Sequence, residues 1–206
     1  MIKIEHIDVV GWEHAVRGMR NPMNSWDKSD SGYVDGVFLL GPADLGLMHR
    51  LYTGGTEHRK FMRMIVVYMD VTAPLYWWKE FDTYKVGTVA NSCSTMHKIH
   101  SRPLTLDDFS TDHLNCYTKS VLESVISGIN NYRRRFVSTN EKPAWWQMIQ
   151  LLPTSYNQRR TVMMNYEVAS TIIRQRTGHK LDEWHVMVDT LNDLPYMQEI
   201  VTGMVR

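Results

Sequence analysis

The sequence lacks the features that mark secreted, membrane-spanning and metal-binding proteins. Its 206 residues include only two cysteines, Cys93 and Cys116, too few for a disulfide framework or a four-cysteine metal site. The longest uninterrupted apolar run, Met64–Met69, is far shorter than the roughly 20 residues that a membrane span needs. The first residues, with Lys3 and Glu5 among them, carry no apolar core of a signal peptide. We therefore expect a cytoplasmic protein with no metal site and no membrane partner.

The sequence also lacks an excess of charge of either sign. Lysine and arginine number 23 and aspartate and glutamate 22, and no charge run exceeds three residues. A formal net charge of +1 gives no broad field to attract nucleic acid, so an anionic ligand must be small and met by a local cluster. Hydrophobic residues make up 43% of the chain, which is typical of a folded protein. The length predicts one domain, residues 1–206.

Periodicity in the first half predicts alternating strands and helices. Residues 1–10 alternate as a half-buried strand, and Trp12, Ala15, Val16 and Met19 have helical spacing up to Asn21-Pro22. Residues 25–36 are rich in Ser, Asp and Gly and are expected to form a loop. A helix begins at Pro42 and closes at Gly54-Gly55. Residues 61–71 predict a central strand buried on both faces, and Pro74 begins a Trp-rich helix that reaches Tyr84.

The second half predicts one long loop followed mainly by helices. Residues 87–103 have no apolar period and are expected to form an unusually long loop, of a kind that is often functional. Apolar residues at helical spacing predict a long helix over 112–136 that ends in Arg133–Arg135. A helix over 144–152, a strand over 156–164 and helices over 165–176 and 182–191 follow. The fold class is α+β (mixed α/β), with a small central sheet flanked by helices.

Two patterns of residues have a characteristic spacing. In the last third, Leu152-Pro153 is followed by Asn165 twelve residues after the proline, and by Arg176 eleven residues later. Upstream lies the segment Gly54-Gly55-Thr56-Glu57-His58. The first pattern resembles the C-terminal motif of the flavin-dependent thymidylate synthases, and the second resembles the glycine-rich turn and Glu-His pair of the same family. The expected order of elements also agrees, so the resemblance covers most of the chain.

The family's signature loop departs from its usual form in this sequence. The family has two arginines bracketing a histidine, then small polar residues and a final arginine, in the region that matches residues 83–96. Here Thr88 fits in one register, Asn91 and Ser94 fit in a register shifted by one, and Lys85 is the only cation of the segment. Lys98 and Arg102, which follow in the expected loop, are further candidates to supply positive charge.

The resemblance implies a function and a set of site residues. It implies methylation of dUMP to dTMP with bound FAD, NADPH as reductant and methylenetetrahydrofolate as carbon donor, in a homotetramer that acts on a nucleotide and not on nucleic acid. Arg176 would be the catalytic residue, since a guanidinium stabilises charge that develops on a uracil ring. The implied cofactor-binding residues are His58, Asn165, Thr88 and Asn91, and the implied substrate-binding residues are Lys85, Ser94 and Arg176.

Plainer interpretations stand beside these roles. Asn165 lies where a helix N-cap is expected, and His58 can be a histidine with a purely structural role. Arg176 can be a surface cation that interacts favourably with a helix C-terminus. Cys93 lies near His97 and Lys98 and could be an activated nucleophile, although the family needs none. The alternative function is a non-catalytic nucleotide- or flavin-binding homologue that keeps the fold and has lost the methylation chemistry.

Overall fold

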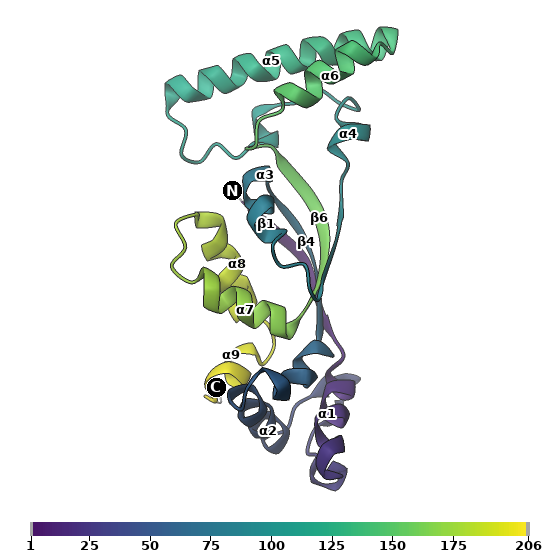
Figure 1. Ribbon diagram of the computed structural model, residues 1–206, viewed down its shortest axis with the longest axis vertical. Helices are drawn as coiled ribbons and strands as arrows, with labels where there is room; N and C mark the ends of the chain where they lie inside the picture. Colours follow the sequence, from purple (N-terminus) through teal and green to yellow (C-terminus); the bar gives the residue numbers. More distant parts are fainter. Residues whose placement is uncertain (1, 205–206) are drawn as a thin grey trace. The chain divides into compact units, whose positions relative to one another are not determined.

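A computed structural model describes residues 2–204, which divide into two compact units (Figure 1). The first unit comprises residues 2–5, 70–83 and 90–161, and the second comprises residues 6–69, 84–89 and 162–204. Each unit therefore collects segments that are far apart in the sequence. The prediction of one domain over residues 1–206 stays a prediction.

The main sheet has four strands in the order β1-β4-β6-β5. These strands are β1 (Lys3–Val10), β4 (Val66–Pro74), β5 (Thr88–Ser92) and β6 (Asn157–Asn165). The sheet is small and antiparallel and helices hold 55% of the residues, which confirms the mixed α/β class. A separate two-stranded hairpin joins β2 (Gly32–Val34) to β3 (Val37–Leu39).

Among residues 2–204 no helix is both long enough and apolar enough to cross a membrane.

Most of the predicted helices are confirmed. In the described part of the chain, four 3₁₀ helices accompany the α-helices: η1 (Asn21–Met23), η2 (Trp26–Lys28), η3 (Thr56–Arg63) and η4 (Leu106–Asp108). The α-helices are α1 (Trp12–Arg20), α2 (Pro42–Thr53), α3 (Leu75–Phe81), α4 (Thr95–Lys98), α5 (Cys116–Thr139), α6 (Lys142–Leu151), α7 (Tyr166–Arg176), α8 (Asp182–Asn192) and α9 (Met197–Thr202).

The first unit has a core beneath the long helix α5, which packs against α6 (Figure 1). Asn130 of α5 ties the preceding chain to this core, because its amide accepts from the backbone N–H of Leu104 and donates to the carbonyl of Leu104, both at 2.8 Å. Trp78 of α3 donates to the carbonyl of Gln158 on β6 at 2.9 Å. The apolar side chains of the core are Ile99, Leu104, Phe109, Leu122, Ile126, Ile129 and Met148.

The core of the second unit centres on Tyr166, the first residue of α7. Its side chain is fully buried, its hydroxyl donates to the carbonyl of Pro195 at 2.9 Å, and its ring lies edge-on to Trp12 at 5.1 Å. Burial, together with the nearby charge of Glu199, raises the pKa of Tyr166. Tyr166 thus joins α7 to α1 and to the segment that precedes α9.

The expected strand over 61–71 is wrong in its start and in its burial. Residues 56–63 form η3, in which Phe61 and Met62 are buried, and the strand begins at Val66. One face only of β4 is buried: Val67 and Met69 are inside, while Asp70 on the other face bonds Arg159 and Thr161. A polar network on β6 therefore covers that face where apolar packing was expected.

The expected loop over 87–103 is also wrong, because it contains β5 and α4. The backbone N–H of Cys93 bonds the carbonyl of Arg159 at 2.9 Å, as part of the pairing with β6. Residues 89–92 are exposed, so their side chains show no apolar period, although the backbone is paired. Backbone hydrogen bonds alone define this edge strand, and such bonds leave little trace in composition.

Two further elements were not predicted, and one helix starts later than expected. The β2–β3 hairpin turns at Asp35-Gly36, where both residues have positive φ, a type I′ signature that the sequence carries. Helix α9 was not predicted from the spacing of apolar residues either. Helix α5 begins at Cys116 and not at residue 112, because Asn115 caps it by accepting from the N–H of Thr118 at 3.0 Å.

A buried ion pair joins α1 to α2. Arg20 Nε lies 2.6 Å from Asp44 Oδ1, and Asp44 is 0% exposed. The hydroxyls of Ser29 and Ser31 donate to Asp44 Oδ2 at 2.6 and 2.7 Å. Burial by itself would raise the pKa of Asp44, but the hydrogen bonds from both serines and from Arg20 outweigh it, so the pKa lies below its ordinary value.

We predict that Asp44→Asn lowers the free energy of unfolding at pH 7 by about 3–5 kcal/mol, because it leaves the Arg20 charge buried without its partner. Since folding lowers the pKa of Asp44, its contribution is fully present above the ordinary value of 3.8 and is lost as the pH falls through the lower folded value. Urea unfolding at neutral and acidic pH should show the difference between wild type and variant shrinking in acid. Asp27→Asn, an exposed neighbour, is the control, and equal stability of Asp44→Asn and wild type at pH 7 would contradict the prediction.

Candidate functional site

Arg176 is the last residue of α7, and aromatic side chains hold its guanidinium. Its Nε donates to the hydroxyl of Tyr84 at 2.9 Å, and its Nη1 lies 3.2 Å from His179 Nε2. The guanidinium carbon lies 4.4 Å from the ring centre of Trp184, which is fully buried. A cation on an aromatic face gains about 0.5–2 kcal/mol, so these contacts fix both the position and the plane of the charge.

Tyr84 orients this cation from a second direction. Its hydroxyl accepts from Arg176 and donates to Gln175 Oε1 at 3.0 Å, so both hydrogen-bonding roles of the hydroxyl have a partner. Its ring lies edge-on to Trp184 at 6.1 Å. A guanidinium held in a fixed plane can donate to a planar carbonyl or carboxylate with little loss of side-chain entropy.

Asn165 lies at the other end of α7, where β6 ends. Its side-chain oxygen accepts from the N–H of Val168 at 3.0 Å, which confirms the N-cap interpretation. Its backbone N–H donates to the carbonyl of Gly87 at 3.2 Å. No described residue accepts a hydrogen bond from its Nδ2. The amide therefore caps the helix with one end and keeps a donor at the other.

Gly87 and Thr88 complete this junction. Gly87 has φ +80°, and a Cβ added there would lie 2.5 Å from Asn165 Nδ2, so only glycine fits without displacement. The hydroxyl of Thr88 is buried, and no described residue bonds it. Segment 84–88 thus brings Tyr84, Lys85 and Thr88 next to α7, which carries Asn165 and Arg176. Lys85 is exposed.

The structure does not bring the other expected site residues into this cluster. His58 lies in η3 with a half-exposed ring, and its Nε2 is 3.6 Å from Glu57 Oε1. Asn91 and Ser94 belong to the first unit. Asn91 is exposed on β5, while the hydroxyl of Ser94 caps α4 by accepting from the N–H of His97 at 3.0 Å.

Arg102 forms an ion pair with Asp108 in the first unit. Its Nη1 donates to Asp108 Oδ2 at 2.9 Å, and its Nη2 bonds the other oxygen. Burial alone would raise the pKa of Asp108, but the hydrogen bonds from Arg102 and Thr105 hold it below its ordinary value. Lys85 and Lys98 are therefore the exposed cations that remain from the three candidates.

Sequence reasoning missed Tyr84, His179 and Trp184 as partners of Arg176. His179 follows Arg176 at a three-residue step, a signal that the sequence carries, whereas Tyr84 is 92 residues away and gives none. Among residues 2–204 no three His, Cys, Asp or Glu side chains converge as metal ligands.

Comparison with known proteins gives a fold and no family assignment. No protein-family model matches the chain, and neither does any curated protein. Thymidylate synthase X from Helicobacter pylori, solved with FAD and dUMP, is 17% identical, with a TM-score of 0.68 over 96% of this chain and 94% of that one. A second structure of the H. pylori protein with FAD and dUMP is 16% identical, with a TM-score of 0.68 over 100% of this chain and 99% of the other.

The solved structure of a different protein is similar to the same extent. The UMP/dUMP methylase PolB from Streptomyces cacaoi, bound with 5-Br dUMP, is 15% identical, with a TM-score of 0.68 over 99% of this chain and 96% of that one. The chain therefore has the fold of these proteins along nearly its whole length.

We predict that Gly87→Ala destabilises the protein more than Gly178→Ala does. Both positions have positive φ, which costs alanine about 1–2 kcal/mol, but a Cβ meets nothing within 4 Å at Gly178 and meets Asn165 at Gly87. Asn165→Ala alone should cost about 1 kcal/mol through loss of the cap. In urea unfolding, the double variant Gly87→Ala/Asn165→Ala should lose less than the sum of the single losses, because the clash disappears. Strict additivity would mean that the two residues do not contact each other.

Proposed function

We propose that this chain is a flavin-dependent thymidylate synthase-type enzyme, which methylates dUMP to dTMP with FAD, NADPH and methylenetetrahydrofolate. The observation that carries the proposal is the placement of Asn165 and Arg176 at the two ends of one helix, beside segment 84–88. This helix lies in a fold shared with proteins crystallised with FAD and dUMP. We further propose a cytoplasmic homotetramer, which exposed apolar side chains of α5, Tyr117, Val121 and Val137, support.

Arg176 would act on the pyrimidine. Its guanidinium, held by Tyr84 and Trp184, can donate to a uracil carbonyl and stabilise the negative charge that develops on the ring when its 5-carbon attacks an electrophile. Preorganisation by the aromatic rings reduces the cost of reorienting the cation during the reaction. Lys85, exposed two residues before Gly87, would provide charge for the phosphate.

The polar groups at the junction fit the edge of a flavin. The buried hydroxyl of Thr88 lacks a partner among the described residues, and Asn165 Nδ2 keeps a donor beside the preceding residue, Gly87, so the ring's carbonyl and nitrogen acceptors would find hydrogen bonds there. His58 and Asn91 are the remaining proposed contacts. When bound, the flavin would supply the hydride chemistry, while the protein binds and orients the reactants.

The second candidate function is a nucleotide- or flavin-binding homologue without methylation chemistry. The signature segment favours this alternative, because it has Lys85 where the resemblance leads one to expect arginines, and Arg102 is held by Asp108. Lysine cannot reproduce the two parallel hydrogen bonds that arginine makes to a phosphate.

We expect purified protein to bind FAD and to keep the flavin absorbance band after desalting. Asn165→Asp, which preserves the cap oxygen but removes the Nδ2 donor, should weaken FAD binding about tenfold, the effect of about 1.4 kcal/mol for one hydrogen bond. Asn140→Asp on the exposed end of α5 is the matched control and should bind normally. Colourless protein that takes up no added FAD would refute cofactor binding.

We expect Arg176→Ala to lose about 1.5–3 kcal/mol of dUMP affinity by calorimetry, as for removal of a charge-assisted hydrogen bond. Arg174→Ala, an exposed arginine on the same helix, should bind as wild type. Lys85→Ala should weaken dUMP more than deoxyuridine, which has no phosphate. If wild type gives no heat with millimolar dUMP, or if Arg176→Ala binds equally well, the proposed substrate site is wrong.

A further inference from the structure

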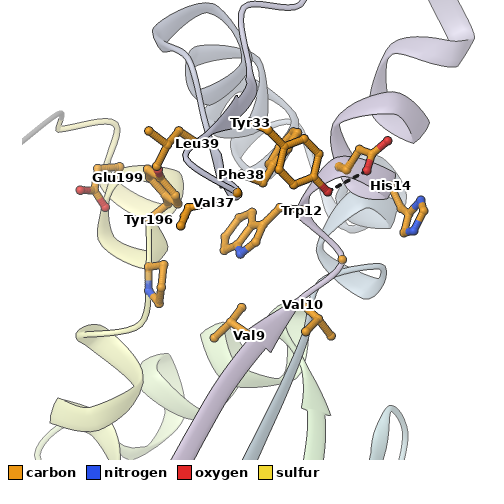
Figure 2. A pocket seen from close by; sticks show the side chains of 14 residues that line it. Val9, Val10, Trp12, His14, Tyr33, Val37, Phe38, Leu39, Tyr196 and Glu199 are labelled. Carbon is orange, nitrogen blue, oxygen red and sulfur yellow. Dashed lines mark hydrogen bonds between the residues drawn. The ribbon is translucent and has the colours of Figure 1, made fainter.

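The second unit contains a cavity of about 690 Å³ that none of the expected site residues lines (Figure 2). Its walls come from the end of β1 with the first turn of α1, from the β2–β3 hairpin, and from the start of α9. This volume falls in the range of small-molecule sites, about 300–1,000 Å³.

Four aromatic rings line the cavity in two edge-to-face pairs. Trp12 meets Tyr196 at 5.3 Å, and Tyr33 meets Phe38 at 5.2 Å. Trp12 is 8% exposed, and no described residue accepts a hydrogen bond from its indole N–H. In Figure 2 the indole lies among Val9, Val37 and Tyr196. The rings present electron-rich faces together with one indole N–H donor.

The charge of the lining is negative. Glu13 and Glu199 contribute carboxylates, and no lysine or arginine is among the described lining residues. His14 also lines the cavity, and its Nδ1 lies 3.1 Å from Arg17 Nη2. The hydroxyl of Tyr33 donates to Glu13 Oε2 at 3.0 Å, which holds one carboxylate at the wall and raises the pKa of Tyr33.

Two residues with positive φ shape the backbone around the cavity. Gly11 has φ +99°, and a Cβ there would lie 2.2 Å from the carbonyl oxygen of Met64. Tyr196 has φ +57°, an uncommon left-handed conformation for a bulky residue, and its hydroxyl accepts from the N–H of Leu40 at 3.3 Å. This hydrogen bond joins the residue that follows the hairpin to the start of α9.

We propose that this cavity binds an organic ammonium ion with an apolar body. Such a cation is attracted by aromatic faces and by both carboxylates, while the aliphatic side chains Val9, Val37 and Leu39 contact its apolar part. A neutral ligand of the same shape would gain the apolar contacts only, and an anion would meet two like charges. The site is independent of the proposed nucleotide chemistry.

The test compares 2-phenylethylamine, which is a cation at neutral pH, with the neutral 2-phenylethanol and the anionic 3-phenylpropanoate by calorimetry on the full chain. We expect the amine to bind about tenfold more tightly than the alcohol, a difference of one cation–π contact and one ion pair, and the propanoate to give no heat. Glu199→Gln should weaken the amine several-fold and leave the alcohol unchanged. Glu123→Gln, an exposed glutamate on α5, is the matched control.

Three outcomes would overturn the proposal. They are no heat with millimolar amine, equal affinity for the amine and the alcohol or propanoate, and unchanged amine affinity in Glu199→Gln. Glu199 has no described hydrogen-bond or ion-pair partner for its side chain, so this substitution preserves the folded wall. Far-ultraviolet circular dichroism of the variant verifies that it is folded.

Discussion

The candidate site depends on the hydrogen bonds that turn β6 into α7. Asn165 closes the first turn of α7 with its side chain and holds Gly87 with its backbone, while the next residue, Tyr166, donates its backbone N–H to the carbonyl of Ile65 at 3.0 Å. The helix that starts there ends at Arg176. The place of the guanidinium and the course of segment 84–88 therefore follow from one junction.

Pairs of an arginine with a carboxylate stabilise both units. In the first unit, Arg159 bonds Asp70 at 2.6 Å and Arg160 bonds Asp82 at 2.7 Å, so these arginines, like Arg102, hold the fold together. In the second unit, Arg20 pairs with Asp44 and Arg63 pairs with Glu167 in the same way, while Arg176 also lies against the ring of Trp184.

The sequence predicts those helices and strands in which apolar side chains recur at a regular spacing. It does not predict an element that is held only by backbone hydrogen bonds. Helices α1, α2 and α5 to α8 and strands β1 and β6 follow from apolar spacing and caps, and Asn165 could be placed at a helix start. Strand β5 was not predicted, because its exposed side chains show no alternation of apolar and polar residues. For the site, the spacing of Asn165 and Arg176 was visible, but the support of Arg176 by Tyr84 and Trp184 arises only when distant segments meet.

The interleaving of the two units along the chain has a consequence during synthesis on the ribosome. The first unit has all its segments once residue 161 has left the exit tunnel, whereas the second needs residues up to 204. Contacts such as that of Leu40 with Tyr196 span 156 residues and carry a large loop-closure cost. Residues 6–69 therefore cannot complete their packing in the second unit until residues 162–204 have been synthesised. The nascent chain is most exposed to aggregation and most dependent on chaperones in that interval.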